Sequence, residues 1–182
     1  VALAASALNA LVAESMAKAR LPVMRFQPSA GTLCADGVIV HWEIANLRAA
    51  LAAGLIPLVH GDVAFDNRRG GTITSTEALF FYLAGHLPVQ RILLLGEVEG
   101  VLDASGRLIE RITPSSLPEV EAALGGSAGT DVTGGMETKV REMVALVERT
   151  PGLEVRILDG RDPDRVLRVL STDAAEGTLI SR

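Results

Sequence analysis

The sequence predicts an α/β protein built around a largely parallel central sheet, and three observations support this. Helical and strand patterns alternate along the whole chain, as they do in strand–helix–strand units. The strand candidates are apolar runs, which are typical of strands covered on both faces. Hydrophobic residues make up 48% of the 182 residues and charged residues 21%, so the chain can bury a sizeable core.

The first half of the chain alternates in this way. Residues 1–20 carry apolar side chains at helical spacing, and because the chain opens within an amphipathic helix we expect a further segment before it. Strands are expected at 37–44 and 55–62, the second of them buried, with a helix between them that ends at Gly54. The segment 63–75 alternates around "NRRGG", which is a hairpin pattern, and "TEALFFYLAGHL" then predicts a helix.

The second half begins with a strand in "RILLLGEV" and a second hairpin-like piece around "DASGR". Ser116 and Glu119 form a possible capping box for a helix that runs through Leu124. The loop "GGSAGTDVTGG" contains mostly small residues, and it leads into a helix from about Gly135 to Arg149.

The last elements follow the same alternation. Residues 153–160 predict a strand. Asp162 is placed as an N-cap and Pro163 as the first helical residue, so "PDRVLRVL" predicts a helix. The final "GTLI" reads as a short strand, and the whole order therefore favours the α/β class.

Composition argues against several functional classes. The formal net charge is -5 and aromatic residues are only 3%, whereas nucleic-acid binding needs clustered basic residues and stacking aromatics, so no nucleic-acid partner is expected. No apolar run approaches the roughly 18 residues that cross a bilayer, so no membrane partner is expected either. Cys34 is the only cysteine, which excludes an internal disulfide and fits a reducing cytoplasm.

The stretch "DVTGGMETK" carries a pattern for binding phosphate. Gly134 and Gly135 let backbone N–H groups approach an anion, and the helix that follows favours negative charge at its start. Lys139 leans back toward that start, because helical side chains tilt toward the N-terminus. Asp131 could orient a lysine near a transferred group. In the alternative interpretation, the two glycines only relieve a tight turn and Lys139 is solvated.

The segment "VHGD" is a second candidate site, because ligands of open α/β sheets bind at the carboxyl ends of strands. In the alternative interpretation, Gly61 serves only the turn, Asp62 caps it, and His60 is a hydrogen-bonded buried histidine. No second histidine or carboxylate lies nearby at a metal-ligand spacing, so no protein metal site is predicted.

The order of these pieces resembles the amino acid kinase superfamily, and most closely its isopentenyl phosphate kinases. The segments that carry the resemblance are "LIPLVHGDVAFD", "ITSTEA", "RILLLGEVEGVLD", "DVTGGMETK", "RILDG" and "EGTLI". The resemblance implies a three-layer α/β/α sandwich in a single domain, 1–182. Residues 1–90 would lie mainly on the acceptor-substrate side and 91–182 mainly on the nucleotide side. It also implies a homodimer.

For the nucleotide side, the resemblance assigns roles to five residues. Asp131 would organise the lysines around the transferring phosphoryl group. Gly135 and Lys139 would bind the nucleotide, with the backbone of Gly134 adding a donor. Glu97, in "GEVEGV", takes the position of an acidic residue that contacts the nucleotide in the family.

For the acceptor side, the resemblance points to Gly61, Asp62 and Thr76 as substrate-binding residues. Thr76 stands where the family usually has a glycine near the substrate phosphate. The family's N-terminal part, a lysine-containing Gly-rich loop and a later Gly-rich segment with a histidine, has no counterpart in these 182 residues. We therefore expect the chain to be the C-terminal portion of a kinase.

The activity that the resemblance implies is ATP-dependent phosphorylation of isopentenyl phosphate to isopentenyl diphosphate, with Mg²⁺ bound to ATP oxygens. One alternative is a fosfomycin kinase-like enzyme, or another small phosphate or carboxylate kinase of the superfamily. An alternative of another class is a non-catalytic nucleotide-binding fragment or subunit.

Overall fold

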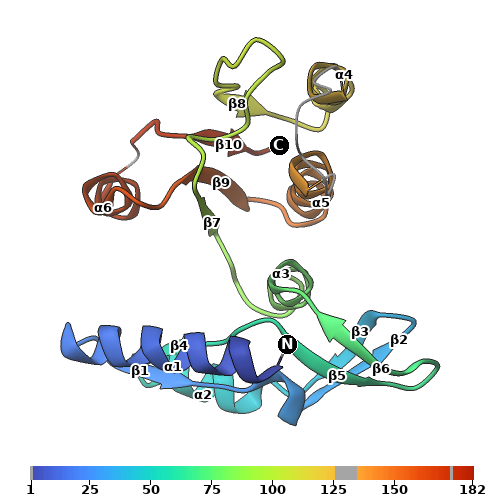
Figure 1. Cartoon of the computed structure of the whole chain (residues 1–182), viewed down its shortest axis with the longest axis vertical. Helices are drawn as coiled ribbons and strands as arrows, with labels where there is room; N and C mark the ends of the chain where they lie inside the picture. The colour runs from blue at the N-terminus through green and yellow to red at the C-terminus, as the bar shows by residue number, and fades with distance from the viewer. Residues whose placement is uncertain (1, 126–134, 173) are drawn as a thin grey trace. The chain divides into compact units, whose positions relative to one another are not determined.

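The computed structural model describes residues 2–125, 135–172 and 174–182 (Figure 1). The chain divides into two compact units, Val1–His86 and Leu87–Arg182. Both units mix helices and strands, which confirms the α/β class, and each unit has its own sheet structure.

The first unit contains two sheets. Its elements, in chain order, are α1 (Ala2–Lys18), β1 (Val23–Arg25), the 3₁₀ turn η1 (Pro28–Ala30), β2 (Thr32–Ala35), β3 (Val38–Trp42), α2 (Ala45–Ala52), β4 (Ile56–Leu58), β5 (Asp62–Asp66), β6 (Gly70–Thr74) and α3 (Thr76–Ala84). Strands β1 and β4 form a parallel pair, and the other sheet has the order β3-β2-β5-β6. Strands β2 and β5 are parallel, while β2–β3 and β5–β6 are antiparallel.

Most elements of this unit agree with the sequence prediction. The expected hairpin is β5–β6, in which Asp62 pairs with Thr74 and Asp66 with Gly70. The strand expected at 55–62 is shorter, and it is not fully buried, since the Ile56 side chain is 37% exposed. Among the described residues, β4 pairs with β1 in a two-stranded sheet. The sequence did not predict β2.

Asp66 is hydrogen-bonded to both turns of the β3-β2-β5-β6 sheet, the one between β2 and β3 and the one between β5 and β6. Its buried carboxylate accepts hydrogen bonds of 2.7 to 3.2 Å from four backbone N–H groups, those of Asp36, Gly37, Arg68 and Arg69. Burial alone would raise the pKa of Asp66, but these bonds outweigh it and lower the pKa from 3.8 to about 2. The charged form of Asp66 is therefore the form that the fold stabilises.

This arrangement predicts an acid-sensitive contribution to stability. A depressed pKa stabilises the fold above the pKa of the unfolded chain, and the contribution is lost as pH falls from 3.8 toward about 2. We expect Asp66→Asn to lower the thermal midpoint clearly at about pH 7 and much less at about pH 2.5. Thermal unfolding of both proteins at the two pH values measures this. An equal difference in thermal midpoint at the two pH values would show that the negative charge of Asp66 does not contribute to its hydrogen bonds with the four N–H groups.

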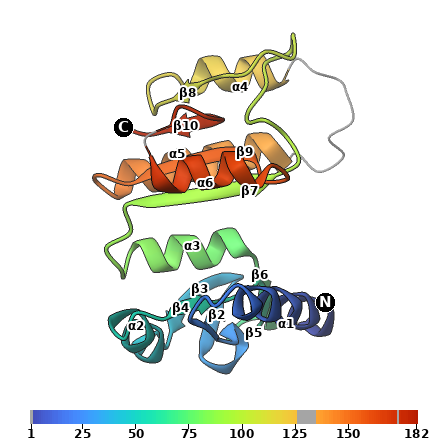
Figure 2. The same ribbon diagram turned by 90° about the vertical axis from the view of Figure 1, so that its left-hand side faces the viewer.

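The described residues of the second unit form a four-stranded sheet of order β7-β9-β10-β8. Its elements are β7 (Arg91–Gly96), β8 (Arg111–Ile112), α4 (Leu117–Gly125), α5 (Gly135–Arg149), β9 (Glu154–Asp159), α6 (Pro163–Ser171) and β10 (Thr178–Ile180). The pairs β7–β9 and β8–β10 are parallel, and β9–β10 is antiparallel. Helix α6 covers one face of the sheet, and α5 covers the other with α4 beside it (Figures 1 and 2). This unit is therefore an α/β/α sandwich, as expected.

Helix α5 is held to the sheet by an apolar stripe. Its buried side chains are those of Val140, Met143, Val144, Leu146 and Val147. The stripe recurs at the spacing of an amphipathic helix, so the position of α5 is fixed by core packing over most of its length. The predicted helix from about Gly135 to Arg149 is confirmed.

The helix starts of this unit give one confirmation and one correction. Asp162 caps α6 as predicted, accepting from the N–H groups of Asp164 and Arg165. The predicted capping box of Ser116 with Glu119 is wrong. Ser116 instead exchanges bonds with Thr113: the Thr113 N–H donates to Ser116 Oγ at 2.9 Å, and the Ser116 N–H donates to Thr113 Oγ1 at 3.2 Å. The reciprocal cap thus forms one turn earlier than the sequence suggested.

Candidate functional site

The start of α5 is the candidate phosphate-binding site. Gly135 is the first residue of the helix, and Lys139 lies about one turn later with a half-buried side chain. Asp131 and Gly134 lie outside the described residues, so their predicted roles stay predictions. The geometry nevertheless puts Lys139 on the turn from which a side chain leans back toward the helix start.

Arg141 holds the first half of α5 to α4. Its Nε donates to Glu121 Oε1 on α4 at 2.8 Å, and its Nη2 donates to Glu137 Oε1 at 2.9 Å. The hydrogen bond and charge of Glu121, and then those of Glu137, raise the pKa of Arg141. Because α4 ends at Gly125 and α5 begins at Gly135, this contact joins the helices on both sides of residues 126–134.

The carboxyl ends of β7 and β9 meet beside one another. The two strands are parallel with Gly96 opposite Asp159, so Glu97 follows directly at the sheet edge where α/β proteins bind ligands. The Glu97 side chain is exposed. Gly160 allows this close approach, because a Cβ there would lie 2.8 Å from the Leu95 Cβ.

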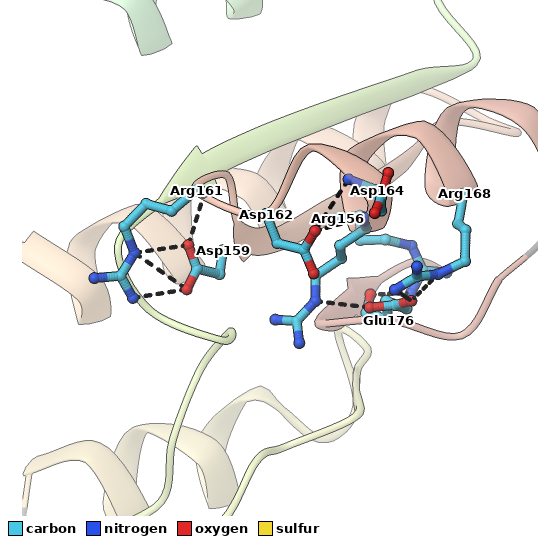
Figure 3. Close-up of polar contacts among 8 residues, drawn as sticks. Arg156, Asp159, Arg161, Asp162, Asp164, Arg168 and Glu176 are labelled. Atoms are coloured by element: carbon cyan, nitrogen blue, oxygen red, sulfur yellow. Dashed lines mark hydrogen bonds and ion pairs between the residues drawn. The ribbon is translucent and has the colours of Figure 1, made fainter.

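Helix α6 begins at the same sheet edge but does not offer free backbone donors to an anion. The carboxylate of Asp162 accepts from the N–H of Asp164 at 3.0 Å and from the N–H of Arg165 at 3.2 Å (Figure 3). These are N–H groups that an anion would need. The start of α6 is therefore a poor site for binding phosphate.

The three predicted acceptor residues lie together in the first unit. Gly61 passes so close to the end of β6 that a Cβ on it would be 3.1 Å from the Thr74 carbonyl oxygen and 3.5 Å from the Thr76 nitrogen. Thr76 begins α3, and the preceding residue, Ser75, caps that helix by accepting from the Ala78 N–H. A side chain at position 61 would push these two backbone segments apart by a few tenths of an ångström, which favours a glycine there.

Asp62 is completely buried, and its carboxylate is bound by backbone groups. Its Oδ2 accepts from the Ser29 N–H at 3.1 Å and its Oδ1 from the Val63 N–H at 2.9 Å. Burial alone would raise the pKa of Asp62, but the hydrogen bonds from Ser29 and Val63, aided by His60, lower it. Asp62 therefore joins η1 to the start of β5 as a charged carboxylate.

His60 lies at the same place, next to Gly61. Both ring nitrogens are buried, and neither has a hydrogen-bond partner among the residues that the structure describes. The interpretation of His60 as a hydrogen-bonded core histidine is therefore wrong. No pattern in the sequence signals this, since hydrogen bonding of a buried ring depends on groups brought from other segments.

The predicted residues divide between the two units. Gly61, Asp62 and Thr76 belong to Val1–His86, and Glu97, Gly135 and Lys139 to Leu87–Arg182. Within 2–125, 135–172 and 174–182, no group of three or more His, Cys, Asp or Glu side chains could hold a metal ion. No helix in these ranges is long and apolar enough to cross a membrane.

Comparison with known proteins gives the family. Residues 2–159 match the model of the Amino acid kinase family. The chain belongs to the amino acid kinase family. Similar proteins within the family include the isopentenyl phosphate kinase of Methanothermobacter thermautotrophicus, 32% identical over 182 residues that cover 96% of this chain and 66% of that protein. The isopentenyl phosphate kinase of Haloferax volcanii is 39% identical over 140 residues, covering 76% of this chain and 55% of that protein.

Other amino acid kinases are also similar. The acetylglutamate kinase of Cereibacter sphaeroides is 35% identical over 150 residues, covering 79% of this chain and 47% of that protein. A crystal structure of isopentenyl phosphate kinase matches with a TM-score of 0.78 and 26% identity, covering 97% of this chain and 66% of that one. The chain thus spans between about half and two thirds of the length of these relatives.

Proposed function

We propose that the protein transfers a phosphoryl group from ATP to the phosphate of isopentenyl phosphate, giving isopentenyl diphosphate and ADP. The observation that carries the proposal is the similarity of 96% of this chain to a protein named isopentenyl phosphate kinase. The start of α5 supports it, since a helix start followed one turn later by a lysine suits an anionic nucleotide tail.

In this reaction an oxygen of the acceptor phosphate attacks the γ-phosphorus of ATP. A new P–O bond forms as the bond to the β–γ bridging oxygen breaks, and ADP leaves. Lys139 and the N–H groups of Gly134 and Gly135 would neutralise the charge on the transferring group, while Asp131 would orient the lysine. Mg²⁺, bound by ATP oxygens, would withdraw further negative charge.

The acceptor would lie on the side of Gly61, Asp62 and Thr76, and Glu97 would contact the nucleotide. Residues 1–90 would form mainly the acceptor side and 91–182 mainly the nucleotide side. From the family resemblance we further propose a cytoplasmic homodimer with no nucleic-acid or membrane partner.

An acceptor assay tests this proposal. ATP and Mg²⁺ are supplied with isopentenyl phosphate, fosfomycin or N-acetylglutamate, and ADP release is measured for each. The last acceptor is included because acetylglutamate kinases are among the similar proteins. We expect turnover with isopentenyl phosphate. Turnover with only one of the other acceptors would identify that compound as the substrate in place of isopentenyl phosphate. Nucleotide binding without turnover of any acceptor would favour a non-catalytic subunit.

A further inference from the structure

We propose that Arg161 is a positioning residue for the nucleotide, because it holds the loop that carries Glu97 against the end of β9. The inference rests on the proposed function in one respect, the assignment of Glu97 to the nucleotide side. Beyond that it depends only on contacts within the second unit.

The guanidinium of Arg161 connects two loops that are distant in the sequence. Its Nη2 donates to the Glu97 carbonyl oxygen at 2.9 Å, across 64 residues of chain. The same Nη2 donates to Asp159 Oδ2 at 2.7 Å, and Nε donates to Asp159 Oδ1 at 3.0 Å (Figure 3). One planar group therefore fixes the residue after β7 to the last residue of β9.

Asp159 is itself held in place, so Arg161 has a rigid partner. The Asp159 side chain is only 14% exposed, and its Oδ1 also accepts from the Arg161 N–H at 2.9 Å. The hydrogen bonds from Arg161 lower the pKa of Asp159 from 3.8 to about 2, so the carboxylate stays charged well into the acid range. The fork of two bonds to a fixed carboxylate leaves the guanidinium little freedom.

The contact is poorly placed to stabilise the fold as a whole. The Arg161 side chain is 65% exposed, and exposed ion pairs add little to stability. Residues 97–100 form bends and no regular strand, so their position depends on individual contacts of this kind. The parallel β7–β9 ladder ends at Gly96 and Asp159 and does not include Glu97. Losing the Arg161 bond would therefore release Glu97 while leaving the sheet intact.

The expected result is a selective loss of nucleotide affinity. We expect Arg161→Ala to raise the dissociation constant of a fluorescent ATP analogue and the KM for ATP about tenfold. The KM for the acceptor should change less than about twofold, and the thermal midpoint by less than about 2 °C. Arg161→Lys should recover part of the affinity, because an ammonium can still reach one of the two acceptors.

Arg107→Ala is the matched control. Arg107 also pairs with an aspartate in the second unit, Asp103 at 3.2 Å, and its side chain is 83% exposed. Hydrogen bonds from Ser105 and Arg107 likewise lower the pKa of Asp103 to about 2. That pair closes its own hairpin and does not contact Glu97, so nucleotide affinity should be unchanged.

The binding measurement needs no acceptor, which separates the two proposals. If the wild-type protein binds the analogue but does not phosphorylate isopentenyl phosphate, the proposed acceptor is wrong. The comparison of nucleotide affinity between wild type and Arg161→Ala is still valid in that case. Equal nucleotide affinity in wild type, Arg161→Ala and Arg107→Ala would overturn the inference. So would a loss of affinity in Arg161→Ala that is accompanied by an equal rise in the acceptor KM or by unfolding.

Discussion

Replacing Lys139 with alanine should lower phosphoryl transfer by about two to three orders of magnitude. The lysine lies about one turn into α5, and its ammonium would neutralise charge that builds on the transferring group. Core packing of α5 does not depend on it, because the buried stripe begins at Val140. The measurement is kcat with saturating ATP and isopentenyl phosphate, together with the thermal midpoint, which should stay close to that of the wild type.

The chain contains one other lysine, and this provides a matched control. Lys18 lies in the last turn of α1, is 75% exposed and pairs with Glu14 at 2.7 Å. Lys18→Ala removes the same charge from a surface ion pair, so turnover and stability should both remain near the wild-type values. Near-normal turnover of Lys139→Ala would exclude the lysine from the site and would weaken the proposed role of the α5 helix start.

The second large effect is expected for Asp62→Asn in the first unit. The substitution keeps the size of the side chain but places an amide group where a buried carboxylate accepts from Ser29 and Val63. At least one of these N–H groups loses its acceptor, which should cost about 1–3 kcal/mol of unfolding free energy. Since Gly61 is adjacent and packs against Thr76, the KM for the acceptor should rise more than the KM for ATP.

Denaturant unfolding and acceptor titration measure these two effects. The control is Asp36→Asn, which removes the same charge in the same unit but affects only exposed ion pairs with Arg68 and Arg69. Asparagine also tolerates the left-handed backbone of that position, where φ is 52°. Equal stability losses in the two variants would mean that the hydrogen bonds of the buried Asp62 carboxylate contribute no more to stability than the exposed ion pairs of Asp36. An unchanged KM for the acceptor in Asp62→Asn would argue against acceptor binding at Gly61, Asp62 and Thr76.

Much of the fold could be predicted from the sequence because its signals are local. The start of α6 depends on Asp162 and the two residues that follow Pro163, all within one turn. The β5–β6 hairpin depends on the residues of its own turn, and α5 on apolar spacing along one helix. The cap at Ser116 is also local, but its partner is Thr113, three residues before it, and not the predicted Glu119.

The site could be predicted only in part. A helix start at Gly135 follows from a pattern of a few residues, and the structure has it. The strand predicted in "RILLLGEV" ends earlier, at Gly96, so Glu97 lies just after it. What the side chains contact could not be predicted in this way. The sequence allows Asp62 to be a ligand or a turn cap, whereas in the structure its carboxylate joins β5 to η1 through Ser29.

The helices, the hairpin and the residues of a possible phosphate site can be predicted from the sequence, because each depends on interactions spanning a few residues. The contacts by which Asp66 joins two turns and Arg161 reaches Glu97 follow from the three-dimensional packing. It alone also showed His60 buried without a hydrogen-bond partner among the described residues. These contacts depend on which strands lie side by side, and that is set by the packing of the whole unit.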